Sequence, residues 1–210
     1  MNLWNAAFAE NPLIAILRGL EPQRAIAVAD VLVETGFRII EVPLNSPDPL
    51  VSIELIAEKY GHDVVIGAGT VLSADDVSAV VDVGGQIIVA PNMNPRVGAK
   101  ALELGVTWCP GVATPSEAFD ALELGASMLK FFPAEIITPS ALGAMRAVIP
   151  RQVQVAVVGG ITPDLMDDYL DAGSNSFGLG SALFKPEYEM GEIKDRALAF
   201  VRALHRYRSS

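Results

Sequence analysis

Short, almost wholly apolar runs alternate along the chain with longer segments whose apolar residues recur at helical spacing. The first pair consists of LIAILRG at 13–19 and the segment 21–36, in which Pro22 stands near the expected helix start and Gly36 just past its end. A short run that is apolar at nearly every position is typical of a parallel strand covered on both faces. The pattern therefore predicts a strand followed by a helix.

This strand–helix unit recurs along the whole chain. Strands are expected at 13–19, 37–44, 63–72, 86–92, 106–113, 126–133, 153–161 and 174–184. Helices are expected at about 21–36, 47–60, 73–83, 94–104, 114–124, 138–148, 163–171 and 189–208. Such even βα spacing predicts a (β/α)8 TIM barrel of the α/β class. An open doubly wound sheet is the weaker alternative, because no G-x-G-x-x-G motif opens a helix.

We expect a single barrel domain over 1–210, because no linker or low-complexity segment interrupts the repeat. The segment 1–11 carries a short amphipathic helix at about 2–10, and the segment 189–210 carries the closing helix. The sequence leaves open whether the N-terminal helix covers the bottom of the barrel or packs on a neighbouring molecule.

The composition describes an acidic protein with a large core. Hydrophobic residues make up 51% of the 210 residues, and 25 acidic against 15 basic side chains give a net charge of −10. This balance argues against nucleic acid and anionic membranes as partners. No apolar run approaches the length of a membrane span, and the N-terminus lacks the layout of a signal peptide. We therefore expect a soluble, cytoplasmic protein.

Cysteine and histidine are too few for the sites they usually form. Cys109 is the only cysteine, so no intramolecular disulfide is possible, and its apolar surroundings favour a buried strand thiol. His62 and His205 are far apart in sequence and are expected on the surface. We predict neither a metal site nor a cofactor.

Two charged residues interrupt apolar strands. Lys130 lies in SMLKFFPAE and Glu41 in FRIIEVPL. If both point into the barrel, burial favours a neutral amine, which is a nucleophile towards ketones, with an acid–base carboxylate nearby. The alternatives are a lysine whose amine extends into water and a salt bridge that only fills the barrel.

Glycine-rich motifs close the last two strands, VVGGI with Gly159 and Gly160, and GLGS with Gly180 and Ser181. The C-terminal ends of the last strands of such barrels frequently bind phosphate through backbone N–H groups. Two adjacent loops of this kind favour a phosphate site over glycines that merely permit tight turns.

Other strand ends supply further candidates for ligand binding. Arg18 follows the first strand and is suited to a carboxylate. Thr70 in GAGT could bind a ligand oxygen or could only cap the next helix. Asn45, Pro91 and Phe132 also stand at strand ends and are candidates for contact with substrate.

The motifs LIAILRG, EVPLNSP, IGAGTVL, VAPN, CPGVATPSEA, LKFFPAE, VVGGI and GLGSALF follow one another from about 13 to 184. In this order the chain resembles the bacterial 2-keto-3-deoxy-6-phospho-sugar-acid aldolases, the class I Schiff-base family of the Entner–Doudoroff and De Ley–Doudoroff routes. The resemblance implies that Lys130 forms an imine with the substrate ketone and that Glu41 shuttles protons. It also implies a homotrimer, with pyruvate and D-glyceraldehyde 3-phosphate as products.

The same resemblance implies contacts of Arg18 and Thr70 with the keto-acid end of the substrate. Family members that act on the gluconate epimer usually carry arginine four residues after the glutamate, whereas this chain has Asn45 there. That variant resembles the branch acting on 2-dehydro-3-deoxy-6-phosphogalactonate, which implies an aldolase for this C4 epimer. The alternatives are the gluconate epimer, both epimers, or a barrel that binds or isomerises a phosphosugar without Schiff-base chemistry.

Overall fold

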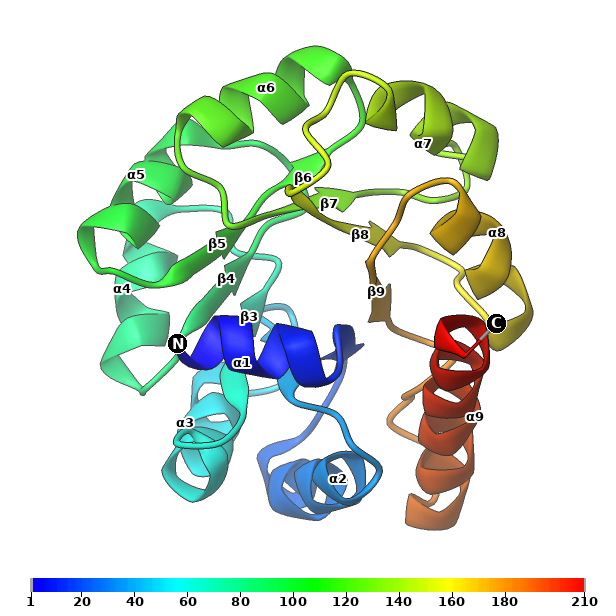
Figure 1. Cartoon of the computed structure of the whole chain (residues 1–210). Helices are drawn as coiled ribbons and strands as arrows, with labels where there is room; N and C mark the ends of the chain where they lie inside the picture. Colours follow the sequence, from blue (N-terminus) through cyan, green and yellow to red (C-terminus); the bar gives the residue numbers. More distant parts are fainter. Residues whose placement is uncertain (1, 210) are drawn as a thin grey trace.

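The computed structural model describes residues 2–209, which form a ring of strands surrounded by helices (Figure 1). The strands are β1 (Leu13–Ile16), β2 (Ile39–Pro43), β3 (Val65–Gly69), β4 (Ile87–Val89), β5 (Thr107–Cys109), β6 (Gly111–Val112), β7 (Met128–Phe131), β8 (Gln154–Val158) and β9 (Ser176–Leu179). The α-helices are α1 (Leu3–Glu10), α2 (Pro22–Glu34), α3 (Pro49–Tyr60), α4 (Ala74–Asp82), α5 (Pro95–Glu103), α6 (Pro115–Glu123), α7 (Pro139–Arg146), α8 (Met166–Asp171) and α9 (Met190–Arg208). The predicted (β/α)8 barrel is confirmed.

Within residues 2–209 the barrel has nine strands where the sequence predicts eight, because the expected strand at 106–113 is interrupted at Pro110. Its first part, β5, pairs with β4, and its second part, β6, pairs with β7. The backbone N–H of Lys130 donates to the Pro110 carbonyl at 2.9 Å, so hydrogen bonding continues across the break. The prediction of one unbroken strand was wrong, since proline cannot donate to the ladder.

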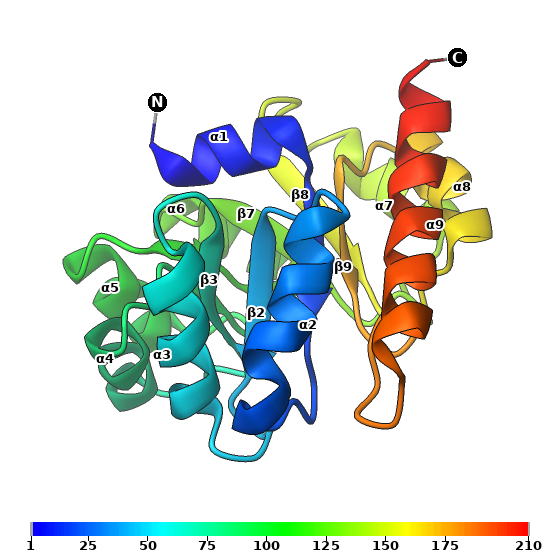
Figure 2. The same cartoon turned by 90° about the horizontal axis from the view of Figure 1, so that it is seen from below.

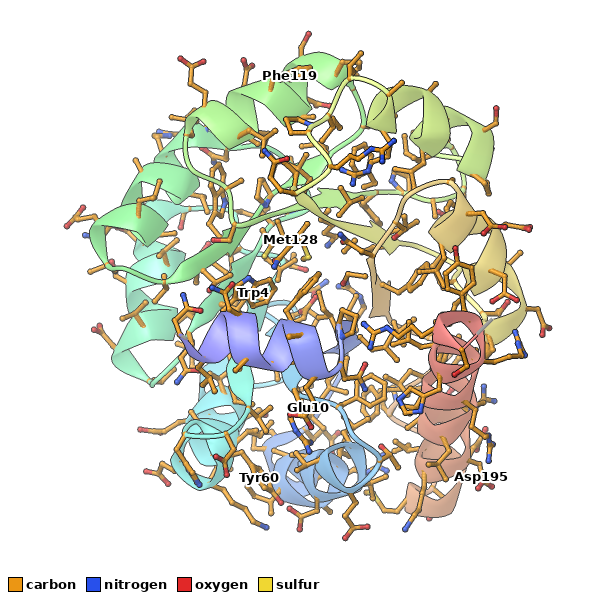
Figure 3. The ribbon with its side chains drawn as sticks, viewed as in Figure 1. Trp4, Glu10, Tyr60, Phe119, Met128 and Asp195 are labelled. Carbon is orange, nitrogen blue, oxygen red and sulfur yellow. The ribbon has the colours of Figure 1, made fainter. Side chains whose placement is uncertain are left out.

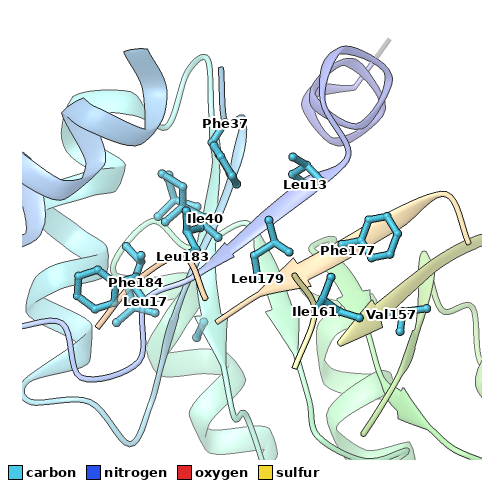
Figure 4. Packing of buried hydrophobic residues seen from close by; sticks show 14 of the residues in the cluster. Leu13, Leu17, Phe37, Ile40, Val157, Ile161, Phe177, Leu179, Leu183 and Phe184 are labelled. Carbon is cyan, nitrogen blue, oxygen red and sulfur yellow. The ribbon is translucent and has the colours of Figure 1, made fainter. Parts of the chain in front are cut away.

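The strands are buried on both faces, as their apolar sequences predict. Alternate side chains point outward and pack against the helices, and Figure 4 shows part of this layer around Leu13, Ile40 and Phe177. The remaining strand residues point inward and form a second, smaller cluster that includes Ile14 and Met128. Whether a candidate side chain points into the barrel or towards the helices therefore depends on its position along the strand.

Helix starts follow the local sequence. Ser73 and Thr114 form capping boxes with Asp76 and Glu117, and each satisfies backbone N–H groups that the helix itself leaves free. The helix expected at 163–171 begins instead as a 3-10 turn, Pro163–Leu165, before α8.

Helix α1 covers the barrel rather than projecting away from it, because it lies across one end of the ring of strands (Figure 2). Trp4 belongs to the inner cluster with Met128, and Figure 3 shows the two side chains near the barrel centre. The Trp4 indole N–H donates to Gln154 Oε1 at 2.9 Å. The helix therefore closes the end of the barrel at which the strands begin, leaving the other end for a ligand. Among residues 2–209, no helix has the length and apolar character needed to cross a bilayer.

Candidate active site

Lys130 and Glu41 both point into the barrel interior. Their side chains line a narrow apolar cavity, and relative exposure is 7% for Lys130 and 2% for Glu41. The other residues lining the cavity are Ile14, Ile16, Val89, Met128, Ala156, Val158 and Gly178. An amine and a carboxyl group thus share a space from which apolar side chains exclude water.

The Glu41 carboxyl group lies deep in the barrel. Among residues 2–209, its buried Oε2 atom has no hydrogen-bond partner. Burial raises the pKa of Glu41 to about 7, although the positive charges of Lys130 and Arg18 oppose the shift. A carboxyl group with this pKa can both accept and donate a proton near neutral pH.

Burial also lowers the pKa of the Lys130 ammonium, while the Glu41 carboxylate opposes the shift and Arg18 adds to it. Among the described residues, no salt bridge joins Lys130 to Glu41. The Nζ atom lies 5.1 Å from the centroid of the Phe132 ring. The amine therefore faces the interior, and the alternatives of a water-exposed lysine and a filling salt bridge do not describe this geometry.

Arg18 and Asn45 meet at the open end of the barrel. Arg18 Nη1 donates to Asn45 Oδ1 at 2.6 Å, and both residues are exposed. Arg18 follows β1, which pairs with β2, and Asn45 follows β2, so strand pairing brings them together. The Asn45 amide oxygen orients a guanidinium that can bind a carboxylate.

Thr70 has a left-handed backbone, with φ of 57°. This conformation is unfavourable for a β-branched residue and indicates a position constrained by its surroundings. Ser73, not Thr70, caps the following helix, so the capping alternative is wrong. The Thr70 hydroxyl remains available beside Gly69, whose Cα lies against the Glu41 carboxyl group.

The Pro91 carbonyl group lies close to the backbone of Gly111 in β6. A Cβ atom on Gly111 would lie 2.2 Å from the Pro91 carbonyl oxygen, and Gly111 is the register partner of Lys130. The close approach requires glycine at this position. Pro91 therefore lies beside the strand that pairs with Lys130, and Phe132 directly follows β7, the strand that carries Lys130.

The glycine-rich candidates lie at the ends of the next two strands. Gly159 and Gly160 follow β8 with φ of 118° and 60°, in the region that favours glycine. Gly180 and Ser181 follow β9, the neighbour of β8, and the Gly180 carbonyl accepts from Leu183 N–H at 2.8 Å. The structure brings all four to the same end of the barrel as Lys130.

Candidates for other chemistry do not gather here. Cys109 is buried, as expected, and burial raises the pKa of its thiol. His62 and His205 are both exposed. Within residues 2–209, no group of three histidine, cysteine or acidic side chains is placed to hold a metal ion.

Comparison with known proteins identifies a matching family. The family model described as "KDPG and KHG aldolase" matches residues 5–197. The chain belongs to the KDPG and KHG aldolase family. A solved structure titled "Native KDPGal structure" superposes with a TM-score of 0.93 at 42% identity, covering 95% of this chain and 97% of that one.

Two curated relatives extend the likeness over nearly the whole chain. "Probable 2-dehydro-3-deoxy-6-phosphogalactonate aldolase" of Rhizobium meliloti (strain 1021) is 48% identical over 194 residues, which is 92% of each chain. "2-dehydro-3-deoxy-6-phosphogalactonate aldolase" of Escherichia coli (strain K12) is 44% identical over 192 residues, covering 91% of this chain and 94% of that one.

The sequence patterns missed two residues that shape this site. Gly69, which precedes Thr70 in the GAGT motif, makes room for the Glu41 carboxyl group. Glu135 lies against Gly159 and Gly160, and its position depends on a turn after β7. The sequence signal for Glu135 is its acidic side chain two residues after FFP, the end of an apolar strand.

Proposed function

We propose that the protein is a class I aldolase that cleaves 2-dehydro-3-deoxy-6-phospho-D-galactonate to pyruvate and D-glyceraldehyde 3-phosphate through a Schiff base on Lys130. The observation that carries the proposal is the pair of buried groups, Lys130 and Glu41, whose pKa values are shifted towards neutrality from opposite sides. Desolvated lysines act as nucleophiles towards carbonyl carbons. A carboxyl group with pKa near the working pH is an effective acid–base catalyst.

In the proposed reaction, the neutral Lys130 amine attacks the C2 ketone. The carbinolamine loses water to give a protonated imine, with Glu41 relaying the protons. Glu41 then takes the proton of the C4 hydroxyl, the C3–C4 bond breaks, and its electron pair passes to the imine as an enamine. After glyceraldehyde 3-phosphate leaves, the enamine is protonated at C3, and water hydrolyses the imine to pyruvate and free Lys130.

The open end of the barrel would bind the two ends of the substrate separately. Arg18, oriented by Asn45, would pair with the substrate carboxylate, and Thr70 would donate to the same end. Pro91 and Phe132 would restrict the keto carbons beside Lys130. Backbone N–H groups at Gly159, Gly160, Gly180 and Ser181 would hold the phosphate. Binding of the distant phosphate then aligns the reacting carbons.

The galactonate epimer is preferred in this proposal on two grounds. The two curated relatives described above carry that activity in their names. Asn45 stands at the position where family members that act on the gluconate epimer usually carry arginine. We further propose that the protein works as a homotrimer in the cytoplasm, in line with the family resemblance of its sequence.

Release of pyruvate from each C4 epimer tests the proposal. The protein is expected to cleave the galactonate epimer with the higher kcat/KM, and Lys130→Met is expected to abolish cleavage of both epimers while the circular dichroism spectrum is retained. Cleavage by Lys130→Met at the wild-type rate would contradict the mechanism. A higher kcat/KM for the gluconate epimer would contradict the substrate assignment alone.

A further inference from the structure

The Glu135 side chain lies directly over the two glycines that end β8. A Cβ atom on Gly159 would lie 2.7 Å from Glu135 Oε2, and one on Gly160 would lie 3.4 Å from Glu135 Oε1. Both carboxylate oxygens thus contact the space above this glycine pair. Any side chain at Gly159 would displace the carboxylate, so the glycines leave room for Glu135.

The backbone around Glu135 is held in place by its neighbours. Ala134 N–H donates to the Val158 carbonyl at 2.9 Å, which fastens the turn after β7 to the end of β8. The Tyr169 hydroxyl contacts the carbonyls of Ala134 and Ile137 at 3.2 and 3.1 Å, and it can donate to one of them at a time. The carboxylate therefore projects from a fixed turn and not from a free loop.

The negative charge of Glu135 is not neutralised by a neighbour. In the described part of the chain, no salt bridge involves this carboxylate. The protein as a whole carries a net charge of −10. An anion that binds at Gly159 and Gly160 would consequently meet a like charge at close range, where solvent and salt screen it only in part.

We propose that Glu135 is a specificity-determining residue that weakens the binding of the phosphate group, so that the phosphorylated aldehyde is released readily after cleavage. This inference rests on the proposed phosphate role of Gly159 and Gly160. In the free protein the carboxylate occupies part of the glycine cradle, and a phosphate must displace it or bind beside it. Both cases lower the affinity for phosphate without touching the reaction at Lys130.

The substitution Glu135→Gln tests the inference, because it keeps the shape of an exposed side chain and removes its charge. Glu123→Gln, on α6, removes the same charge from an exposed position and serves as the matched control. The inhibition constant of inorganic phosphate is measured for all three proteins. We expect Glu135→Gln to lower it about fivefold or more and Glu123→Gln to leave it unchanged.

A second readout is the synthesis direction, in which pyruvate adds to glyceraldehyde or to glyceraldehyde 3-phosphate. Glu135→Gln is expected to raise the ratio of kcat/KM for the phosphorylated over the unphosphorylated acceptor. A residue with a purely structural role would lower this ratio when replaced, or leave it unchanged, and either result would overturn the inference. An unaltered inhibition constant for phosphate would also overturn it.

Borohydride trapping with pyruvate separates this inference from the proposed function, since pyruvate carries no phosphate. If wild type and Glu135→Gln are both trapped and also bind phosphate with the same affinity, the inference about Glu135 fails and the aldolase proposal stands. If wild type is not trapped at all, the aldolase mechanism fails. The inference about Glu135 is then tested by the dissociation constant of phosphate, which Glu135→Gln should lower by the same fivefold factor.

Discussion

Gly69 and Glu41 share a space that holds only one side chain. A Cβ atom on Gly69 would lie 1.8 Å from Glu41 Oε2, 2.4 Å from Cδ and 2.5 Å from Oε1. The whole carboxyl group therefore lies against the bare Cα of the neighbouring strand β3. Since β2 and β3 are paired over five residues, neither backbone can move aside without breaking the ladder.

The substitution Gly69→Ala should consequently displace the Glu41 carboxyl group. We expect kcat to fall by about 10²-fold, because small misplacements of a catalytic group have costs of this size. The half-saturating pyruvate concentration for borohydride trapping should change much less. Gly191→Ala is the control, because a Cβ atom there would meet no atom of residues 2–209 within 4 Å. A kcat for Gly69→Ala equal to that of the control would show that Gly69 has no positioning role.

A shorter acid offers a rescue experiment. Glu41→Asp withdraws the carboxyl group by one methylene, and this alone should reduce kcat. In the double variant Glu41→Asp with Gly69→Ala, the clash is relieved, so the second substitution should cost much less than it costs the wild type. Additive losses in the double-mutant cycle would argue against direct contact between the two residues.

Glu41 should make folding stability depend on pH. Its folded pKa of about 7 is raised above the ordinary value of 4.5, so the folded protein holds the proton more tightly than the unfolded chain. Wild-type stability should therefore fall as pH rises through this window, by on the order of 3 kcal/mol. Glu41→Gln should lose this pH dependence and slow catalysis by about 10²–10⁴-fold.

Urea unfolding of both proteins between pH 4.5 and pH 8 measures the effect. Glu54→Gln, at an exposed acidic residue on α3, is the control and should follow the wild type at every pH. Parallel stability curves for wild type and Glu41→Gln would show that the carboxyl group is not buried as described.

Asn45 should govern the choice between the two C4 epimers through Arg18. With Asn45→Arg, two guanidinium groups would stand side by side, and Arg18 would lose the 2.6 Å bond that orients it. We expect the ratio of kcat/KM for the galactonate epimer over the gluconate epimer to fall about tenfold. Asn45→Ala removes the bond without adding a cation and should raise KM for both epimers. A ratio unchanged by Asn45→Arg would remove Asn45 from epimer selection.

Trp4 should contribute to stability from outside the ring of strands, because its side chain closes the barrel. Trp4→Ala opens a space at the bottom of the inner cluster and is expected to destabilise the protein by about 3–5 kcal/mol. Gln154→Ala removes only the hydrogen bond to the indole, with an expected cost of about 1 kcal/mol. Chemical denaturation measures both. A smaller loss of stability for Trp4→Ala than for Gln154→Ala would mean that α1 does not close the end of the barrel.

The fold and the reacting pair could be predicted from the sequence for physical reasons. Apolar strands alternating with amphipathic helices leave few arrangements other than the barrel. Lys130 and Glu41 were recognisable because a charge inside an apolar strand requires an explanation. Arg18 and Asn45 could be placed near each other because consecutive parallel strands end at the same side of the sheet.

The remaining features depend on relations between segments that no local pattern contains. The role of Gly69 follows from the register of β2 against β3. The position of Glu135 over Gly159 follows from how the turn after β7 folds back on β8. The direction of Trp4 depends on where α1 crosses the barrel. Each of these relations exists only in the folded chain.

The proposed mechanism depends on an imine between Lys130 and the substrate ketone. Borohydride reduction in the presence of pyruvate, followed by peptide mass spectrometry, detects this imine. We expect that a reduced pyruvyl group is attached to Lys130, that activity is lost in proportion to labelling, and that Lys130→Met is not labelled. An unmodified Lys130 in a protein that still cleaves its substrate under the same conditions would rule out the imine.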